Sequence, residues 1–434
     1  MILEFSASNF RSIDEERTFS LYMTGSQGGH LSNTVPLEGT PYRILKTVGV
    51  YGSNASGKTN LLRALGALRQ MVRRSHHFHE GEKIGLYEPC SFNGETEKRE
   101  TRFQLEFTCP YDGKETRFVY VLAYTDVAIT YEKLTAYFTN RESLLFERDL
   151  SSNNGKLVFG ASYKGGTRNI ACFPNQAYLS VAGQNAAAPV IVRKVVSYIT
   201  RRIATPRVDC IFMRDVKQSD ERAWNLVSHI DVGVENVRLE EKSVSEEELN
   251  MPPDLPQELK NDVLNRARKR IVLKHSDNMG AFMRLDLDEE SNGTQKMVRL
   301  LPQIVDILVS GGVFVVDELD NSMHPFMAEM LVKLFNDPDI NKGQAQLIFT
   351  THNANLLSPD LLRRDQIWFA EKVGGRSRYY SLDSFDKKVV TPYSPYVKWY
   401  MEGRFGAIPS IDYAAIVSEL VGWRERALEN AEKA

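Results

Sequence analysis

A glycine-rich segment early in the chain has the residue types and spacing that bind nucleotide phosphates. Residues 52–59, Gly-Ser-Asn-Ala-Ser-Gly-Lys-Thr, fit the P-loop pattern G-x-x-x-x-G-K-[ST]. In such a loop the backbone N–H groups surround the β-phosphate, the lysine reaches the β- and γ-phosphates, and the last hydroxyl binds Mg²⁺. The expected phosphate-binding residues are Gly52, Ser53, Asn54, Ala55, Ser56, Gly57, Lys58, Thr59 and Asn60.

Two consecutive acids follow an apolar segment much later in the chain. Residues 313–316 are Val-Phe-Val-Val, which is typical of a buried parallel strand, and Asp317 and Glu318 come directly after them. Because α/β sheets bind ligands at the carboxyl ends of their strands, a role in the same site is favoured over a helix-capping acid pair. We expect Asp317 to help bind Mg²⁺ and Glu318 to be the base that activates water.

Two weaker motifs lie on either side of the acids. Ser291 and Gly293 stand at the start of a predicted helix over 297–308, where a hydroxyl, an amide and a helix N-terminus suit a phosphate. Residues 346–352 are an apolar strand that ends in His352, whose imidazole could contact the γ-phosphate. Each motif alone is weak, and a lone histidine after a strand is more often structural. The order of all four motifs along the chain favours contact with phosphates over a structural role.

Local patterns place these motifs at junctions between strands and helices. Residues 47–51 predict a buried strand before the P-loop, and residues 61–69 predict an amphipathic helix after it. Residues 101–107 and 117–124 alternate as strands do, and residues 111–114 between them favour a hairpin turn. The sequence therefore predicts an α/β fold, with a parallel or mixed core sheet and an antiparallel sheet beside it.

The chain divides into three predicted parts. Residues 1–190 form a first lobe that carries the P-loop, and residues 190–275 form a charged and mostly helical insertion. A proline-rich loop over 251–256 interrupts the insertion. Residues 275–434 form a second lobe, which ends in a helix over 413–431.

Composition is that of an ordinary globular protein. The 434 residues are 42% hydrophobic and 25% charged, and the formal net charge of −2 does not indicate a nucleic-acid-binding protein. The cysteines lack C-x-x-C spacing, we expect no secretory signal, and no apolar run approaches the roughly 20 residues of a membrane span. We expect a cytoplasmic protein that does not bind membranes and whose thiols are reduced, at Cys90, Cys109, Cys172 and Cys210.

Some suggestive residues have simpler explanations. The histidines at 76, 77 and 79 lack an accompanying set of Cys or acidic ligands, so a solvated helix end is favoured over a metal site. Arginines make one side of the P-loop helix basic, and a solvated face is favoured over a DNA or partner contact. These arginines are Arg63, Arg69, Arg73 and Arg74.

The order of the motifs resembles the ABC-type ATPase heads of SMC and Rad-type repair proteins. It resembles more closely the OLD-like and abortive-infection AAA ATPases of bacteria, including the ATPase components of anti-phage systems such as PARIS and Septu. The resemblance covers nearly the whole chain. Residues 5–13 resemble the opening strand of this family, residues 291–294 its shortened signature motif, residues 320–325 its His-Pro segment and residues 403–409 its C-terminal segment.

This resemblance implies ATP hydrolysis, with ATP and Mg²⁺ as cofactors, at an interface between subunits. Lys58, Glu318 and His352 would be the catalytic residues, and Thr59 and Asp317 would hold the metal. The signature helix would contact ATP bound by a second subunit, so two sites would form in a head-to-head dimer or a higher homo-oligomer. Loss of the γ-phosphate would weaken that contact.

The sequence departs from the family pattern in several places. Residues 291–294 keep one glycine of the usual Leu-Ser-Gly-Gly-Gln signature, and the usual glutamine after the first strands is not obvious, with Gln104 and Gln176 as candidates. No heptad arms lie between residues 60 and 290, and residues 353–434 lack the acidic cluster of the OLD nucleases. We expect a separate protein to supply any nuclease or toxin activity.

Two functions remain open at this point. The first is a regulatory or sensor ATPase of a bacterial anti-phage system, which controls a separate toxic effector and responds to a phage trigger protein. The second is a DNA-repair or DNA-end-binding ATPase, which would need a basic groove and salt-dependent DNA binding. A transporter ATPase is disfavoured by the His324-Pro325 segment and the degenerate signature.

Overall fold

The computed structural model describes most of the chain. The described residues are 1–24, 29–92, 99–153, 155–168, 170–205, 220–230, 233–245, 248–249, 251–252, 255–276 and 282–432. Cys210 lies outside them, so the expectation for its thiol is not addressed by the structure. Cys90, Cys109 and Cys172 are free cysteines.

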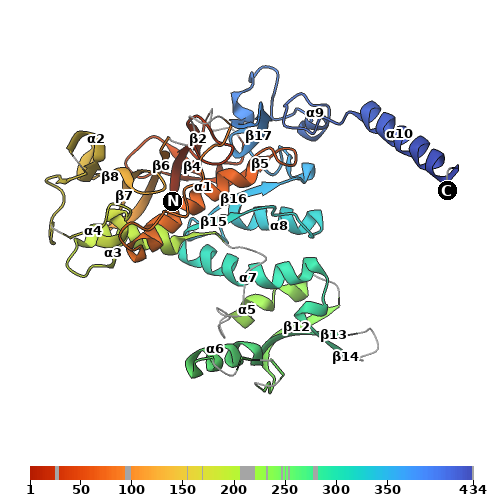
Figure 1. The fold of residues 1–434 in the computed structure, drawn as a ribbon, viewed down its shortest axis with the longest axis horizontal. Helices are drawn as coiled ribbons and strands as arrows, with labels where there is room; N and C mark the ends of the chain where they lie inside the picture. Colours follow the sequence, from red (N-terminus) through yellow and green to blue (C-terminus); the bar gives the residue numbers. More distant parts are fainter. Residues whose placement is uncertain are drawn as a thin grey trace.

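A six-stranded sheet forms the centre of the molecule (Figure 1). Its strands, in spatial order, are β11 (Ile203–Ala204), β15 (Val313–Val316), β16 (Gln346–Thr351), β5 (Thr47–Tyr51), β17 (Ile367–Val373) and β18 (Arg376–Ser381). The first five strands are parallel, and β18 pairs antiparallel with β17. Every residue of β5, β15 and β16 is buried, as expected for parallel strands that are covered on both faces. The three predicted core strands are confirmed.

A seven-stranded antiparallel sheet lies beside the core sheet. Its strands, in spatial order, are β10 (Leu157–Phe159), β9 (Ser143–Asp149), β8 (Ile129–Tyr137), β7 (Lys114–Tyr124), β6 (Thr101–Tyr111), β1 (Ile2–Ser8) and β2 (Arg17–Ser20). The predicted hairpin is confirmed as β6 and β7. Its two turn residues, Asp112 and Gly113, have φ of 51° and 75°, as a type I′ turn requires. A small pair, β3 (Thr34–Pro36) and β4 (Arg43–Leu45), completes this lobe.

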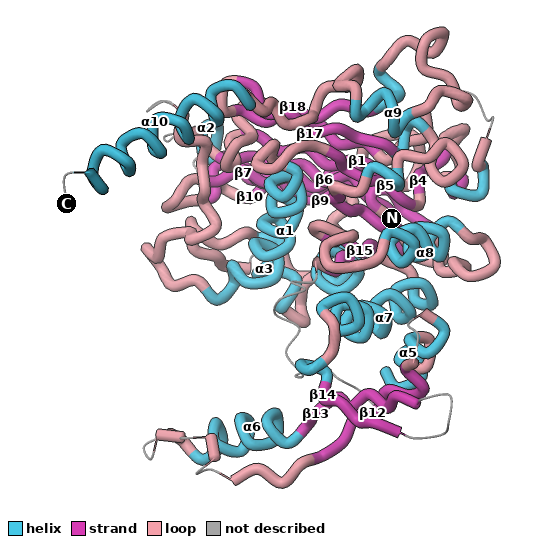
Figure 2. The backbone as a smooth tube through the Cα atoms, turned by 90° about the vertical axis from the view of Figure 1, so that its right-hand side faces the viewer, coloured by secondary structure: helices cyan, strands magenta, loops and turns pink. Residues whose placement is uncertain are grey.

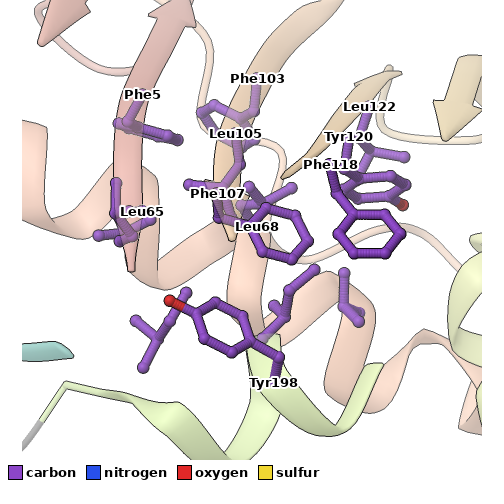
Figure 3. Close-up of a cluster of buried hydrophobic side chains, with 14 of the residues drawn as sticks. Phe5, Leu65, Leu68, Phe103, Leu105, Phe107, Phe118, Tyr120, Leu122 and Tyr198 are labelled. Atoms are coloured by element: carbon purple, nitrogen blue, oxygen red, sulfur yellow. The ribbon is translucent and has the colours of Figure 1, made fainter. Parts of the chain in front are cut away.

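Helix α1 (Lys58–Arg74) packs between the two sheets and buries its apolar face there. Figure 3 shows Leu65 and Leu68 of α1 beside Phe5, Phe103 and Phe107 of the antiparallel sheet. The ring of Tyr198, in the π-helical segment Tyr198–Arg202, stacks on that of Phe107 with centroids 5.0 Å apart. The amphipathic helix predicted after the P-loop is therefore confirmed. Helices α2 (Leu150–Asn153), α3 (Tyr178–Gln184) and α4 (Val190–Ser197) belong to the same lobe.

Two further helices cover the opposite face of the core sheet. Side chains of β15 alternate between the two cores, because Val313 and Val315 pack with α1 whereas Phe314 and Val316 pack with the second group. That second group includes the apolar faces of α7 (Asn292–Ser310) and α8 (Pro325–Asn336). The core sheet is thus the middle layer of an α/β fold, as predicted.

A small subdomain projects below α7 (Figure 2). It contains α6 (Gln257–Arg268) and an antiparallel sheet of β12 (Val234–Glu241), β13 (Lys269–Ser276) and β14 (Phe282–Asp286), with α5 (Asp220–Trp224) between it and α7. The prediction that residues 190–275 are mostly helical is wrong for β12 and β13. Their charged side chains pair across strands, with Arg270 3.6 Å from Glu240 and 3.3 Å from Asp286.

The C-terminal part of the chain leaves the core sheet through α9 (Tyr396–Met401) and ends in α10 (Tyr413–Glu432). Helix α10 confirms the predicted final helix and points away from the body of the molecule (Figure 1). Within the described residues, none of the helices combines the length and the apolar character needed to cross a membrane.

Candidate nucleotide-binding site

The P-loop connects the end of β5 to the start of α1. Lys58 is the first residue of α1, and its Nζ donates hydrogen bonds to the carbonyl oxygens of Gly52 (2.8 Å) and Ser53 (3.0 Å). Its ammonium group therefore lies within the loop, at the place where phosphates bind in loops of this type. Gly57, which caps α1, has a left-handed φ of +105° that favours glycine.

The residues expected to hold magnesium lie next to each other. The Thr59 hydroxyl donates to Oδ1 of Asp317 over 3.1 Å, which joins the first turn of α1 to the end of β15. Hydroxyl and carboxylate oxygens are ligands that Mg²⁺ prefers. Across the described residues, no cluster of three His, Cys, Asp or Glu side chains could hold a metal ion. The Thr59 hydroxyl and the Asp317 carboxylate would fit an ion that completes its coordination with phosphate oxygens and water.

Glu318 has an unusual backbone conformation, and hydrogen bonds hold both its backbone and its side chain. Its φ is +50°, a left-handed value that costs energy in any residue other than glycine. Its N–H donates to the Thr350 hydroxyl (2.7 Å), and that hydroxyl donates to Oδ1 of Asp317 (2.6 Å). The side-chain amide of Asn321 donates to Oε2 of Glu318 over 3.3 Å. These contacts fix the direction in which the Glu318 side chain leaves the backbone.

His352 follows β16, on the same edge of the sheet as the acids. Its backbone N–H donates to Oδ1 of Asp320 (3.3 Å), which also accepts from the Thr351 hydroxyl (2.5 Å). Burial lowers the pKa of His352, and the charge of Lys58 lowers it further, against the opposing effect of the nearby acids. The imidazole is therefore neutral at pH 7. The structure brings Lys58, Glu318 and His352 into one site.

The signature residues have structural roles at the start of α7. Ser291 caps the helix, because its Oγ accepts a hydrogen bond from the Thr294 N–H over 3.1 Å. Gly293 lies against the chain that follows the acids, since a Cβ there would be 2.6 Å from the Ser322 carbonyl oxygen. Among the hydrogen bonds of the described residues, none joins Ser291 or Gly293 to residues 52–60 of the same chain. Their predicted contact with ATP of a second subunit stays a prediction.

Lys296 ties the signature helix to the segment after β15. Its buried Nζ donates to the carbonyl oxygens of Glu318 (2.7 Å), Leu319 (3.2 Å) and Asn321 (3.1 Å). The position of α7 is therefore linked directly to the backbone of the expected catalytic base. The sequence offered no signal for this contact, because a lysine near the start of a helix is usually solvated.

A comparison with protein families identifies the class of this domain. The model described as "AAA domain, putative AbiEii toxin, Type IV TA system" matches residues 48–160 and 209–358, together more than half of the chain. The chain belongs to this AAA family.

Solved structures that resemble the AAA protein include two SMC heads. The SMC head domain from Thermotoga maritima is 14% identical with a TM-score of 0.37, and the comparison covers 88% of this chain and 98% of that chain. The Smc head domain with an extended coiled coil bound to the C-terminal domain of ScpA, derived from Pyrococcus furiosus, is 11% identical with a TM-score of 0.39 and covers 88% and 96%. No curated protein matches the sequence.

The two segments matched by the AAA family contain the P-loop, the signature residues, both acids and His352. Residues 1–47 and the hairpin of β17 and β18 lie outside them, although β17 pairs directly with β5. The site of this AAA domain is therefore bordered by segments that the family match does not include.

The two glutamine candidates lie elsewhere in the AAA protein. The side-chain amide of Gln176 donates to the carbonyl oxygens of His76 (3.2 Å) and Phe78 (2.9 Å), so it holds the chain after α1. Gln104 lies within β6, paired with Ser6 of β1 and Val121 of β7. The structure does not bring either residue to the P-loop by a hydrogen bond within its described part.

Replacing His352 with Ala is expected to slow hydrolysis and spare ATP binding. A neutral imidazole can donate one hydrogen bond to the γ-phosphate as charge develops, and loss of one such donor lowers kcat by roughly 100-fold. Steady-state kcat and KM test this. Because the pKa of His352 is lowered, its imidazole stays neutral from pH 7 to pH 8. The ratio of kcat between the wild type and His352→Ala should therefore be constant over this range. A higher KM with an unchanged kcat would contradict the assigned role.

Thr350 is a site residue that the motifs alone missed, although two hydroxyls at the end of an apolar strand are a usable signal. Thr350→Val keeps the shape of the side chain and removes the acceptor of the Glu318 N–H. We expect it to lower the free energy of unfolding by about 1–3 kcal/mol and to lower kcat by roughly tenfold. Thr350→Ser keeps the hydroxyl and is the matched control. Urea unfolding and kcat measure both effects, and equal behaviour of the two variants would exclude this role.

Proposed function

We propose that this AAA protein binds ATP with Mg²⁺ and hydrolyses it, and that its nucleotide state controls a separate toxic effector in bacterial anti-phage defence. The observation that supports hydrolysis most is the meeting of three chain segments at the ends of β5, β15 and β16. The Thr59–Asp317 and Thr350–Asp317 hydrogen bonds, at 3.1 and 2.6 Å, join all three.

Each residue of the site has its own role in ATP binding or hydrolysis. Lys58 and the P-loop N–H groups bind the phosphates, and Thr59 and Asp317 would hold Mg²⁺, which would supply positive charge next to the phosphates. Glu318 accepts the proton of the attacking water, and His352 contacts the γ-phosphate from the neighbouring strand. Ser291 and Gly293 complete the site of a second copy in a head-to-head dimer or higher oligomer.

The regulatory role has support from the family description, which mentions a putative AbiEii toxin and a Type IV toxin–antitoxin system. The formal net charge of −2 gives no support to a DNA-binding head.

The test is a pull-down of Glu318→Gln from the native host with ATP, followed by mass spectrometry. Lys58→Ala, which should not hold ATP, is the matched control, and one sample is treated with nuclease. A small protein recovered stoichiometrically with Glu318→Gln and released from the wild type on hydrolysis would support the effector role. Recovery of DNA that nuclease removes, without a protein partner, would replace it with the DNA-end-binding function.

A further inference from the structure

The wall behind the P-loop is formed by the hairpin of β17 and β18. A Cβ on Gly57 would lie 1.9 Å from Oγ of Ser377 in β18, and a Cβ on Gly52 would lie 2.3 Å from the carbonyl oxygen of Ala370 in β17. Both glycines that frame the loop are thus in close contact with a segment more than 300 residues later. That segment lies outside the family match.

A chain of hydrogen bonds runs through this wall to the P-loop. The side-chain amide of Asn60 donates to Oγ of Ser12 (2.6 Å), which is 2.7 Å from Oγ of Ser377. The Ser377 hydroxyl donates in turn to the carbonyl oxygen of Ser56 (2.7 Å). Because an amide nitrogen only donates and a carbonyl oxygen only accepts, the two ends fix the direction of every bond. All three serines are at most 5% exposed, so water does not compete.

Tyr379 makes a second contact of the same kind. Its hydroxyl donates to the carbonyl oxygen of Gly57 over 2.8 Å. Burial raises the pKa of Tyr379, so the hydroxyl stays protonated and remains a donor at neutral pH. The Gly57 carbonyl also accepts from the Asn60 N–H (2.9 Å) at the start of α1, so it depends less on Tyr379 than the Ser56 carbonyl depends on Ser377.

These contacts determine which way the P-loop amides point. In a trans peptide the C=O and N–H groups of one unit point in opposite directions. The C=O of Ser56 shares its peptide unit with the N–H of Gly57, and the C=O of Gly57 shares its unit with the N–H of Lys58. Holding both oxygens against the hairpin therefore turns both N–H groups toward the phosphate side of the loop.

We infer that Ser12, Ser377 and Tyr379 are positioning residues of the nucleotide site, and that the β17–β18 hairpin is part of it. This inference rests on the proposed function, because it concerns how ATP is bound. Because P-loop N–H groups surround the β-phosphate, we expect them to contact it to the same extent before and during hydrolysis. Losing their orientation therefore raises KM and the Kd for ATP with little change in kcat.

The experiment compares the Kd for ATP·Mg²⁺ by calorimetry, together with KM and kcat, in matched variants. Ser377→Ala should raise Kd by about tenfold and Tyr379→Phe by a smaller factor, with kcat within about twofold. Tyr380→Phe is the control, because it removes a similar hydrogen bond (2.8 Å to the Phe405 carbonyl oxygen) from the next residue, away from the P-loop. Lys58→Ala is the reference for lost binding.

Each outcome is decisive. Weaker binding by Ser377→Ala and Tyr379→Phe, with Tyr380→Phe like the wild type, supports the inference. If Ser377→Ala does not fold, the test is the comparison of Tyr379→Phe with Tyr380→Phe, which each lose one oxygen atom. Wild-type affinity in Ser377→Ala and Tyr379→Phe, while Lys58→Ala loses binding, overturns the inference and leaves the proposed function standing. A wild-type protein that binds no ATP overturns the proposed function itself.

Discussion

Lys58→Ala is expected to reduce ATP binding to background. The Lys58 ammonium lies within the P-loop on the carbonyl oxygens of Gly52 and Ser53, 2.8 and 3.0 Å away, so no large movement is needed to reach a phosphate. Hydrogen bonds between charged groups contribute about 1.5–3 kcal/mol each, so losing contacts to two phosphates weakens binding by roughly 100-fold or more. Calorimetric titration with ATP·Mg²⁺ measures this directly.

The same variant should keep its fold, because the backbone of α1 is unchanged and the shorter side chain leaves room for water beside the carbonyl oxygens of Gly52 and Ser53. Thermal unfolding without nucleotide checks this point. Lys333→Ala is the matched control, since it removes an equal charge from the surface of α8, where Lys333 pairs with Glu329 at 2.6 Å. Near-normal ATP affinity in Lys58→Ala would show that the phosphates bind elsewhere.

The site was predictable from the sequence where its signals are local. Residues 47–59 and residues 313–318 each combine a strand with the polar residues that follow it, and the parallel pairing of β5, β16 and β15 brings those strand ends together. The Thr59–Asp317 contact follows from this topology, although the two residues are far apart in the chain. The composition of a short segment was enough to predict these parts.

The projecting subdomain shows why other parts were not predictable. Residues 234–241 and 269–276 are rich in charged residues, and such windows favour a solvated helix when they are considered alone. Their strands are stabilised by pairs such as Lys274 with Glu235 (3.0 Å) and by the packing of Val237 and Leu273 beneath α7. Both effects depend on a partner strand about 30 residues away, which no local pattern contains.

The wall behind the P-loop is an extreme case of the same effect. Ser12 and Ser377 are 365 residues apart, and serine and tyrosine carry no motif that would connect them to a phosphate site. What the P-loop pattern does contain is two glycines, and the structure supplies the reason for each in Ser377 and Ala370. The two glycines of the motif therefore indicate that other residues lie close to the loop, but they do not indicate which residues these are.

Glu318→Gln is expected to bind ATP normally and to hydrolyse it roughly 100- to 10,000-fold more slowly, because general-base catalysis contributes 10²–10⁴-fold. The backbone of residue 318 is held by contacts that glutamine keeps, namely its N–H to Thr350 and its carbonyl oxygen to Lys296. The amide has the shape of the carboxylate but cannot accept the proton of the attacking water. Phosphate release at saturating ATP measures the rate.

Because hydrolysis is what separates the proposed subunit interface, Glu318→Gln should also accumulate as an ATP-bound dimer or higher oligomer. Light scattering with and without ATP measures this, and Lys58→Ala should stay in the nucleotide-free state under both conditions. Glu329→Gln, on the surface of α8, is the matched carboxylate-to-amide control and should behave as the wild type does. Hydrolysis by Glu318→Gln at the normal rate would show that another group activates the water. A slow variant that does not assemble would separate the catalytic role from the head-to-head interface, since Ser291 and Gly293 would then not bind ATP of a second copy.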